Sequence, residues 1–189
     1  MATQYPCLDE KIRGFISRQK MFFTASATDA SRVNVSPRST DWFRVVDDHC
    51  AIYLDRTGSG NETAAHMLAD GRLTFMFCAV EGPPRILRLY GTGRIARHDS
   101  DEFAALVTDH FAGDSPGAAR QIVIMKIDLV QTSCGFGVPL FSYEGERDIM
   151  DNWAEKNLAE DVDAFWREKN QVSMDGLPTG LIDGGDGAP

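Results

Sequence analysis

Residues 72–98 read RLTFMFCAVEGPPRILRLYGTGRIARH, two extended stretches joined by a short break. The first, residues 72–80, is a nearly all-apolar strand, and the EGPP that follows breaks it. The second, residues 85–98, is long and alternates apolar with polar residues. Gly91 and Gly93 interrupt it, and we expect a bulge or sharp bend there, as barrels require. The pair predicts strands of an antiparallel barrel.

The flanking sequence adds more strands and several helices. Extended patterns predict strands at residues 21–27, 33–37, 43–46, 51–55, 121–133 and 140–145. Helical patterns predict helices at residues 8–19, 62–71, 100–111 and 147–170. Strands mostly follow one another as hairpins, unlike the strict alternation of a doubly wound parallel sheet. We therefore expect a mainly β fold with helices (α+β), built as a small antiparallel barrel.

The chain is expected to form one domain over residues 1–175, followed by a flexible tail. Residues 176–189 are rich in Gly, Pro and Asp, a composition typical of a frayed terminus. Within the charged helix expected at residues 147–170, Trp153, Phe165 and Trp166 form a stripe. We interpret this stripe as a packing face that suits a dimer interface.

Composition excludes several classes of function. The 189 residues carry 28 acidic and 19 basic side chains, a net charge of −9, which disfavours binding to nucleic acid or to an anionic membrane. No apolar run approaches the roughly 20 residues that span a bilayer, and the start MATQYPCLDEK lacks a signal sequence. The four cysteines form no CxxC pair, and the four histidines form no metal-binding motif. We expect a cytoplasmic protein without a metal site.

The strongest local signal for chemistry is TGSGNET at residues 57–63, between a strand and a helix. Glycines at a helix start leave backbone N–H groups free to converge on an anion, so a phosphate suits this loop. The side chains of Thr57, Ser59, Asn61 and Thr63 add possible donors. The alternative is a plain turn in which Ser59 or Asn61 caps the helix.

Two weaker candidate sites lie elsewhere. Residues 34–38, Asn-Val-Ser-Pro-Arg, end a strand with a hydroxyl and a guanidinium that can hold a phosphate or an oxygen-rich ring. The alternative is an edge strand followed by a solvated arginine. Residues 133–139, SCGFGVP, allow the backbone to approach a flat molecule, or form a hairpin connection with a small buried Cys134.

Four segments together, in order, resemble the pyridoxamine 5′-phosphate oxidase-like family, in its flavin-binding branch of short bacterial proteins. They are VNVSPRS (33–39), AIYLDRTGSGNETAAHM (51–67), RLTFMFCAVEGPPRILRLYGTGR (72–94) and VQTSCGFGVPLFSYEGERD (130–148). The resemblance covers residues 8–180. It implies a split β-barrel of the FMN-binding type that forms a homodimer, with flavin mononucleotide (FMN) bound at the subunit interface.

The same resemblance assigns residues to the cofactor. Asn34, Val35, Ser36, Pro37 and Arg38 would line the flavin ring and ribityl chain. Asp55 and residues 57–63 (Thr57, Ser59, Asn61 and Thr63 among them) would lie at the phosphate, and Cys134 near the cleft. The implied function is an oxidoreductase that transfers hydride through flavin N5 to or from a small substrate, with a nicotinamide cofactor as a candidate donor.

The sequence departs from the family pattern in two places. Many relatives hold the flavin phosphate with an Arg-Lys pair, where this chain reads Ser59-Gly60-Asn61-Glu62. Arg38 is the nearest compensating charge by sequence. The substrate-recognition segment of the biosynthetic oxidase is not recognisable in EGERDIMDNWAEK at residues 144–156, so pyridoxamine phosphate is not predicted as substrate. The alternatives are a non-catalytic binding or storage protein for haem or deazaflavin, and a dimer whose interface is itself the function.

Overall fold

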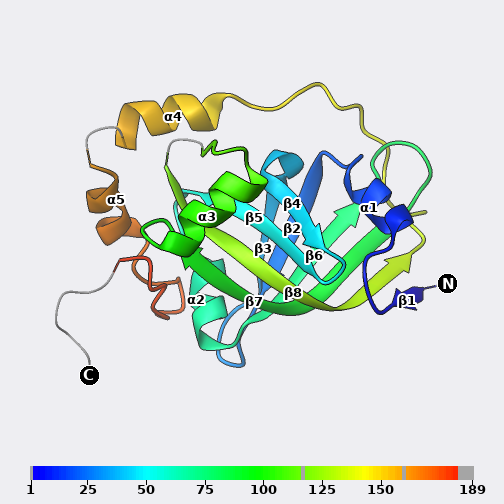
Figure 1. The fold of residues 1–189 in the computed structure, drawn as a ribbon, viewed down its shortest axis with the longest axis horizontal. Helices are drawn as coiled ribbons and strands as arrows, with labels where there is room; N and C mark the ends of the chain where they lie inside the picture. Colours follow the sequence, from blue (N-terminus) through cyan, green and yellow to red (C-terminus); the bar gives the residue numbers. More distant parts are fainter. Residues whose placement is uncertain (1, 116–117, 159–160, 183–189) are drawn as a thin grey trace.

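The computed structural model describes residues 2–115, 118–158 and 161–182, and its framework is one curled antiparallel sheet (Figure 1). The strands are β1 (Thr3–Tyr5), β2 (Met21–Ser26), β3 (Asn34–Ser39), β4 (Phe43–Asp47), β5 (Cys50–Arg56), β6 (Arg72–Cys78), β7 (Ile86–Arg97) and β8 (Ala119–Ser133). Their order is β3-β2-β6-β7-β8-β5-β4, and β1 pairs with β8 outside this path. The predicted α+β split barrel is confirmed.

Aromatic side chains show that the sheet curls until its two ends approach. Phe22 lies on β2, near one end of the strand order, whereas Phe43 and Tyr53 lie on β4 and β5 at the other. The Phe22 ring centroid is nevertheless 4.9 Å from that of Phe43 and 5.5 Å from that of Tyr53. All three side chains are buried, so the core fills the inside of the curl.

The predicted bend in the long strand is confirmed at Gly91. The register between β7 and β8 shifts between Tyr90 and Gly91, which marks a bulge. A Cβ atom at Gly91 would lie 2.0 Å from the carbonyl oxygen of Lys126 on β8. Glycine is therefore required here by the close approach of two strands.

The helices lie around the barrel: α1 (Glu10–Ile16), α2 (Glu62–Ala69), α3 (Asp101–His110), α4 (Ile149–Leu158) and α5 (Val162–Lys169), with a short 3-10 turn at Thr40–Trp42. Helix α1 is capped by Asp9, whose carboxylate accepts the backbone N–H of Ile12 at 2.7 Å. Helix α3 packs Phe103 and Val107 onto the face of β5 and β8 that carries Ile52 and Ile122, forming a second apolar core.

Two sequence predictions near the C-terminus are wrong. The single helix expected at residues 147–170 is two helices, because Asp161 accepts the N–H of Ala164 at 2.8 Å and starts α5 anew. The strand expected at residues 140–145 is absent from the described structure. There the N–H of Phe141 bonds to the carbonyl of Val80, but residues 140–145 form no ladder with a strand of the described residues.

The described part of the expected tail packs against the domain. Leu181 is 1% exposed, and the hydroxyl of Thr179 donates to the carbonyl of Asn170 at 2.6 Å. The rest of the expected tail, residues 183–189, lies outside the described residues. No helix in the described ranges is long and apolar enough to cross a membrane.

Gly91→Ala is expected to lower the free energy of unfolding by roughly 3 kcal/mol, because the added methyl group must displace the backbone of β8. Urea unfolding followed by tryptophan fluorescence measures the change. Gly137→Ala is the matched control, since its Cβ would meet nothing within 4 Å. Equal stability of the two variants would contradict the role assigned to the bulge.

Candidate functional site

Edge strand β3 and the segment from the end of β5 to the start of α2 meet at the candidate site. The amide of Asn34 donates to the hydroxyl of Thr63 at 3.1 Å. The guanidinium of Arg38 lies 2.5 Å from a carboxylate oxygen of Asp55. Four residues that the sequence placed at one cofactor are therefore neighbours, although up to 29 positions separate a bonded pair.

Asp55 is the buried centre of this site. Its side chain is fully buried, and its second carboxylate oxygen accepts from Arg120 Nε at 2.8 Å and from Gln121 Nε2 at 2.8 Å. Burial alone would raise the pKa of Asp55, but attraction to Arg120 and Arg38 outweighs it and holds this pKa below its usual value. Asp55 is therefore an anion between two cations.

Arg38 keeps part of its guanidinium available beside this anion. Its side chain is 23% exposed, and its guanidinium carbon lies 4.7 Å above the ring of Tyr53. Burial alone would lower the pKa of Arg38, but Asp55 raises it above its usual value, so the group is charged. Its Nε atom is buried and has no hydrogen-bond partner among the described residues.

Three of the predicted phosphate-loop side chains point into the protein. Thr57, Asn61 and Thr63 are all buried. The hydroxyl of Thr57 donates to the carbonyl of Ala118 at 2.7 Å, and the amide of Gln121 donates to Asn61 at 2.7 Å. Thr57 and Asn61 are therefore not free donors for a ligand, and the hydroxyl of Thr63 accepts from Asn34.

Ser59 and the backbone at the start of α2 form the outer surface of the loop. Ser59 is exposed, and the side chain of Asn61 makes no capping hydrogen bond to the helix. The Glu62 carboxylate accepts the backbone N–H of Met174 at 3.1 Å, so this negatively charged group is hydrogen-bonded to the C-terminal segment of the chain. An uncapped helix start with two nearby glycines, Gly58 and Gly60, favours an anion.

The remaining residues predicted for the cofactor are those of β3 and Cys134. Val35 is 58% exposed on edge strand β3, Pro37 is exposed, and the hydroxyl of Ser36 donates to Asn34 at 3.3 Å. Cys134 is exposed and directly follows the C-terminal end of β8, whereas Gln121 lies near the N-terminal end of that strand. Within one chain, Cys134 is therefore not part of the site.

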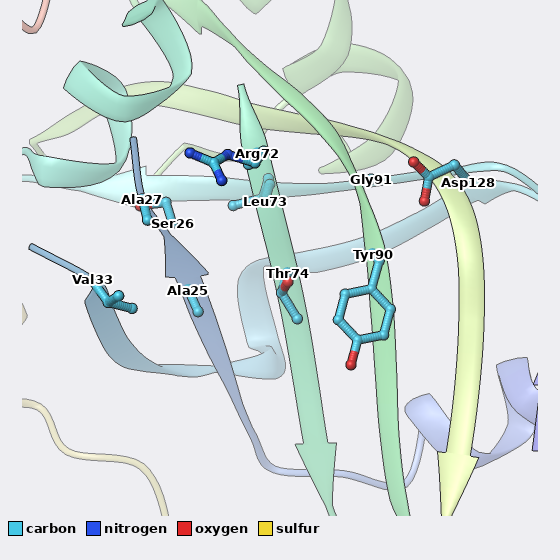
Figure 2. Close-up of a pocket in the computed structure, with 10 residues that line it drawn as sticks. All are labelled: Ala25, Ser26, Ala27, Val33, Arg72, Leu73, Thr74, Tyr90, Gly91 and Asp128. Carbon is cyan, nitrogen blue, oxygen red and sulfur yellow. The ribbon is translucent and has the colours of Figure 1, made fainter. Parts of the chain in front are cut away.

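A pocket of about 350 Å³ opens beside the start of β3, on the sheet face opposite the aromatic core (Figure 2). It is lined by Ala25, Ser26, Ala27, Val33, Arg72, Leu73, Thr74, Tyr90, Gly91 and Asp128. The hydroxyl of Ser26 lies 2.9 Å from Nδ1 of His66 and 3.3 Å from the amide of Asn34. This pocket is thus linked to β3 by hydrogen bonds. No cluster of three or more metal-binding side chains is found in the described residues.

Three polar residues that the sequence did not single out complete the site. Arg120 and Gln121 are both buried and both bind Asp55, and Arg120 also donates to Asn170 at 3.0 Å. The sequence pattern that could have indicated Arg120 and Gln121 is their position as two adjacent polar residues directly before an apolar strand. No local signal marks Asn170.

Comparison with known proteins identifies the family. The sequence model for the family Pyridoxamine 5′-phosphate oxidase matches residues 8–134. The protein ustO of Aspergillus flavus, described as a pyridoxamine 5′-phosphate oxidase family protein, is 34% identical over 94% of this chain and 78% of its own length. The chain belongs to the pyridoxamine 5′-phosphate oxidase family.

Solved structures agree with this family fold. The protein HupZ of Group A Streptococcus superposes with a TM-score of 0.53 at 19% identity, over 65% of this chain and 91% of that one. The protein LDB0262 of Lactobacillus delbrueckii gives a TM-score of 0.51 at 16% identity, over 67% of this chain and 94% of its own. At these identities the two structures support the fold of this pyridoxamine 5′-phosphate oxidase family member and nothing finer.

Asp55→Asn is expected to lower the free energy of unfolding by about 3–5 kcal/mol, because it leaves the buried Arg120 and the partly buried Arg38 without their anion. Urea unfolding at pH 7 measures the loss. The control Glu102→Gln removes a carboxylate from an exposed pair with Arg94 and should cost less than about 1 kcal/mol. Similar losses in the two variants would contradict the central role of Asp55.

The same variant tests the pH dependence. Because the folded pKa of Asp55 is lowered, its ionisation stabilises the native state above the unfolded pKa of about 3.9, and this stability is lost as the pH falls further. The stability difference between the parent and Asp55→Asn should therefore be constant near neutral pH and shrink below about pH 4. A difference independent of pH would mean that Asp55 has the same pKa in the native and unfolded states, and a difference that grows below about pH 4 would mean that Asp55 is protonated in the native state.

Proposed function

We propose that this family member is a flavin-binding oxidoreductase that holds FMN between β3 and the loop at residues 57–61. The observation that carries the proposal is that β3 contacts this segment twice, through Arg38 with Asp55 at the end of β5 and through Asn34 with Thr63 in the first turn of the uncapped helix α2. This brings a cation on β3 close to the segment whose exposed serine and helix start offer donors, a combination that suits a phosphate ester.

The phosphate end would rest on the loop. Ser59 offers an exposed hydroxyl, and the start of α2 offers N–H groups and a favourable dipole. Arg38 adds positive charge from β3. This donor set fits a phosphate without the Arg-Lys pair of other relatives, because Glu62 is turned toward Met174.

The ring end would lie along β3. Val35 and Pro37 present exposed apolar surface there, and the pocket beside Ser26 and Val33 offers adjoining space for a planar group (Figure 2). A bound flavin supplies hydride transfer at N5, while the protein supplies position and hydrogen bonds. We propose a small-molecule substrate, with a nicotinamide cofactor as a candidate electron donor.

We also propose that two copies form a homodimer with the cofactor at their interface, in the cytoplasm. The exposed edge of β3 supports a partner on this side, because Val33 and Val35 are 71% and 58% exposed. A second copy over β3 would cover these side chains and enclose a bound ring.

Ser59→Glu is expected to weaken FMN binding about tenfold, because the new carboxylate faces the phosphate. Titration of the purified protein with FMN, followed by flavin absorbance after gel filtration, measures the affinity. Thr108→Glu adds the same charge at an exposed position of α3 and should bind FMN like the parent.

Two outcomes would contradict the proposal. A parent protein that sheds added FMN does not hold flavin, and absorbance with added haem or deazaflavin then identifies the alternative cofactor. Equal FMN affinity in Ser59→Glu and the parent would place the phosphate away from this loop.

A further inference from the structure

A second cavity is lined in part by the loop at residues 57–59, but largely by residues beyond the family match at 8–134. Residues 134–148 cross the molecule from the end near β1 to the end where α4 and α5 lie (Figure 1). The cavity there has a volume of about 490 Å³. Its lining is Thr57, Gly58, Ser59, Arg147, Ile149, Met150, Trp153 and Phe165.

The walls of this cavity are mainly apolar and aromatic. The rings of Trp153 on α4 and Phe165 on α5 lie 5.5 Å apart at an angle of 76°. Ile149 and Met150 are 64% and 41% exposed, so the described chain leaves much of their apolar surface uncovered. Two nearly perpendicular rings with aliphatic neighbours suit a flat apolar molecule.

Both helices are anchored, which makes the cavity a formed site. Trp166 is 2% exposed, its Nε1 donates to Thr57 at 2.8 Å, and its ring centroid lies 4.5 Å from that of His98. Because Phe165 precedes Trp166 on α5, this anchor fixes the position of its ring. Helix α4 is held by an ion pair between Asp151 and Arg56 at the end of β5.

The charge of the lining is positive. Arg147 is the charged member of the lining set, and it forms no ion pair with any residue in the described ranges. Gly58 and Ser59 of the loop also line the cavity. An apolar cavity with a guanidinium at its wall selects a ligand with an apolar body and one negative group.

We propose that this cavity binds a planar, apolar carboxylate, and that such a compound is the substrate class of the protein. The assignment as substrate rests on the proposed flavin function, because Ser59 lines the cavity and also belongs to the proposed phosphate site. Binding itself depends on the residues of the cavity alone. The probe 2-naphthoate has the required chemistry, and 2-naphthamide is its uncharged counterpart.

Isothermal titration calorimetry of the full chain with each probe tests the proposal. We expect saturable binding of 2-naphthoate, at least tenfold tighter than that of 2-naphthamide. Arg147→Gln should remove this preference by weakening naphthoate about tenfold while leaving naphthamide unchanged. Trp153→Ala should weaken both probes. The control Arg167→Gln removes an exposed arginine of α5 outside the cavity and should bind like the parent.

Several results would overturn the proposal: no saturable binding of naphthoate, equal binding of the two probes by the parent, or an unchanged preference in Arg147→Gln that circular dichroism shows to be folded. Competition between FMN and naphthoate would also overturn it, because the cavity would then be the flavin's own site. If the protein binds naphthoate but sheds FMN, the cavity is supported as a ligand site and the flavin function fails.

Discussion

The carboxylate of Asp55 lies between the guanidinium groups of Arg38 and Arg120, with no exposure to solvent. Taking such charges out of water is costly, and the arrangement persists because each charge is paired and Gln121 donates a further hydrogen bond. Arg38 belongs to β3 at one edge of the sheet, whereas Asp55 belongs to β5 near the other. The charge cluster therefore joins the two ends of the curled sheet, as the aromatic core does from within.

This charge cluster also determines which groups of the loop at residues 57–63 are exposed. Gln121 binds both Asp55 and Asn61, and Arg120 reaches Asn170, whose amide donates to the carbonyl of Gly58 at 3.0 Å. The polar side chains of the loop are used for these internal contacts. What remains on the surface is a serine hydroxyl, two glycines and the start of α2, a mostly backbone surface of the kind that favours an anion.

The loop contacts two parts of the molecule, one inside the family match and one beyond it. One part is the barrel, whose strands β2 to β8 fall within the family match at residues 8–134. The other part consists of α4 and α5, which lie beyond that match and add the cavity with Trp153, Phe165 and Arg147. Ser59 therefore belongs both to the proposed phosphate site of the family scaffold and to the lining of the cavity that the helical pair adds.

The sequence predicted most strands and the barrel bend at Gly91. The order of its motifs predicted the family and pointed to the segments 34–38 and 57–63. These are local signals, because alternation, glycine positions and motif order act within a few residues. The inward turn of Thr57 and Asn61, and the part that Arg120 and Asn170 play in the site, emerged from the folded chain alone. Arg120 bonds to a carboxylate 65 positions away, and Asn170 bonds to a loop 112 positions away. Contacts of that range depend on how the sheet curls and where the C-terminal segment packs, for which no local pattern exists.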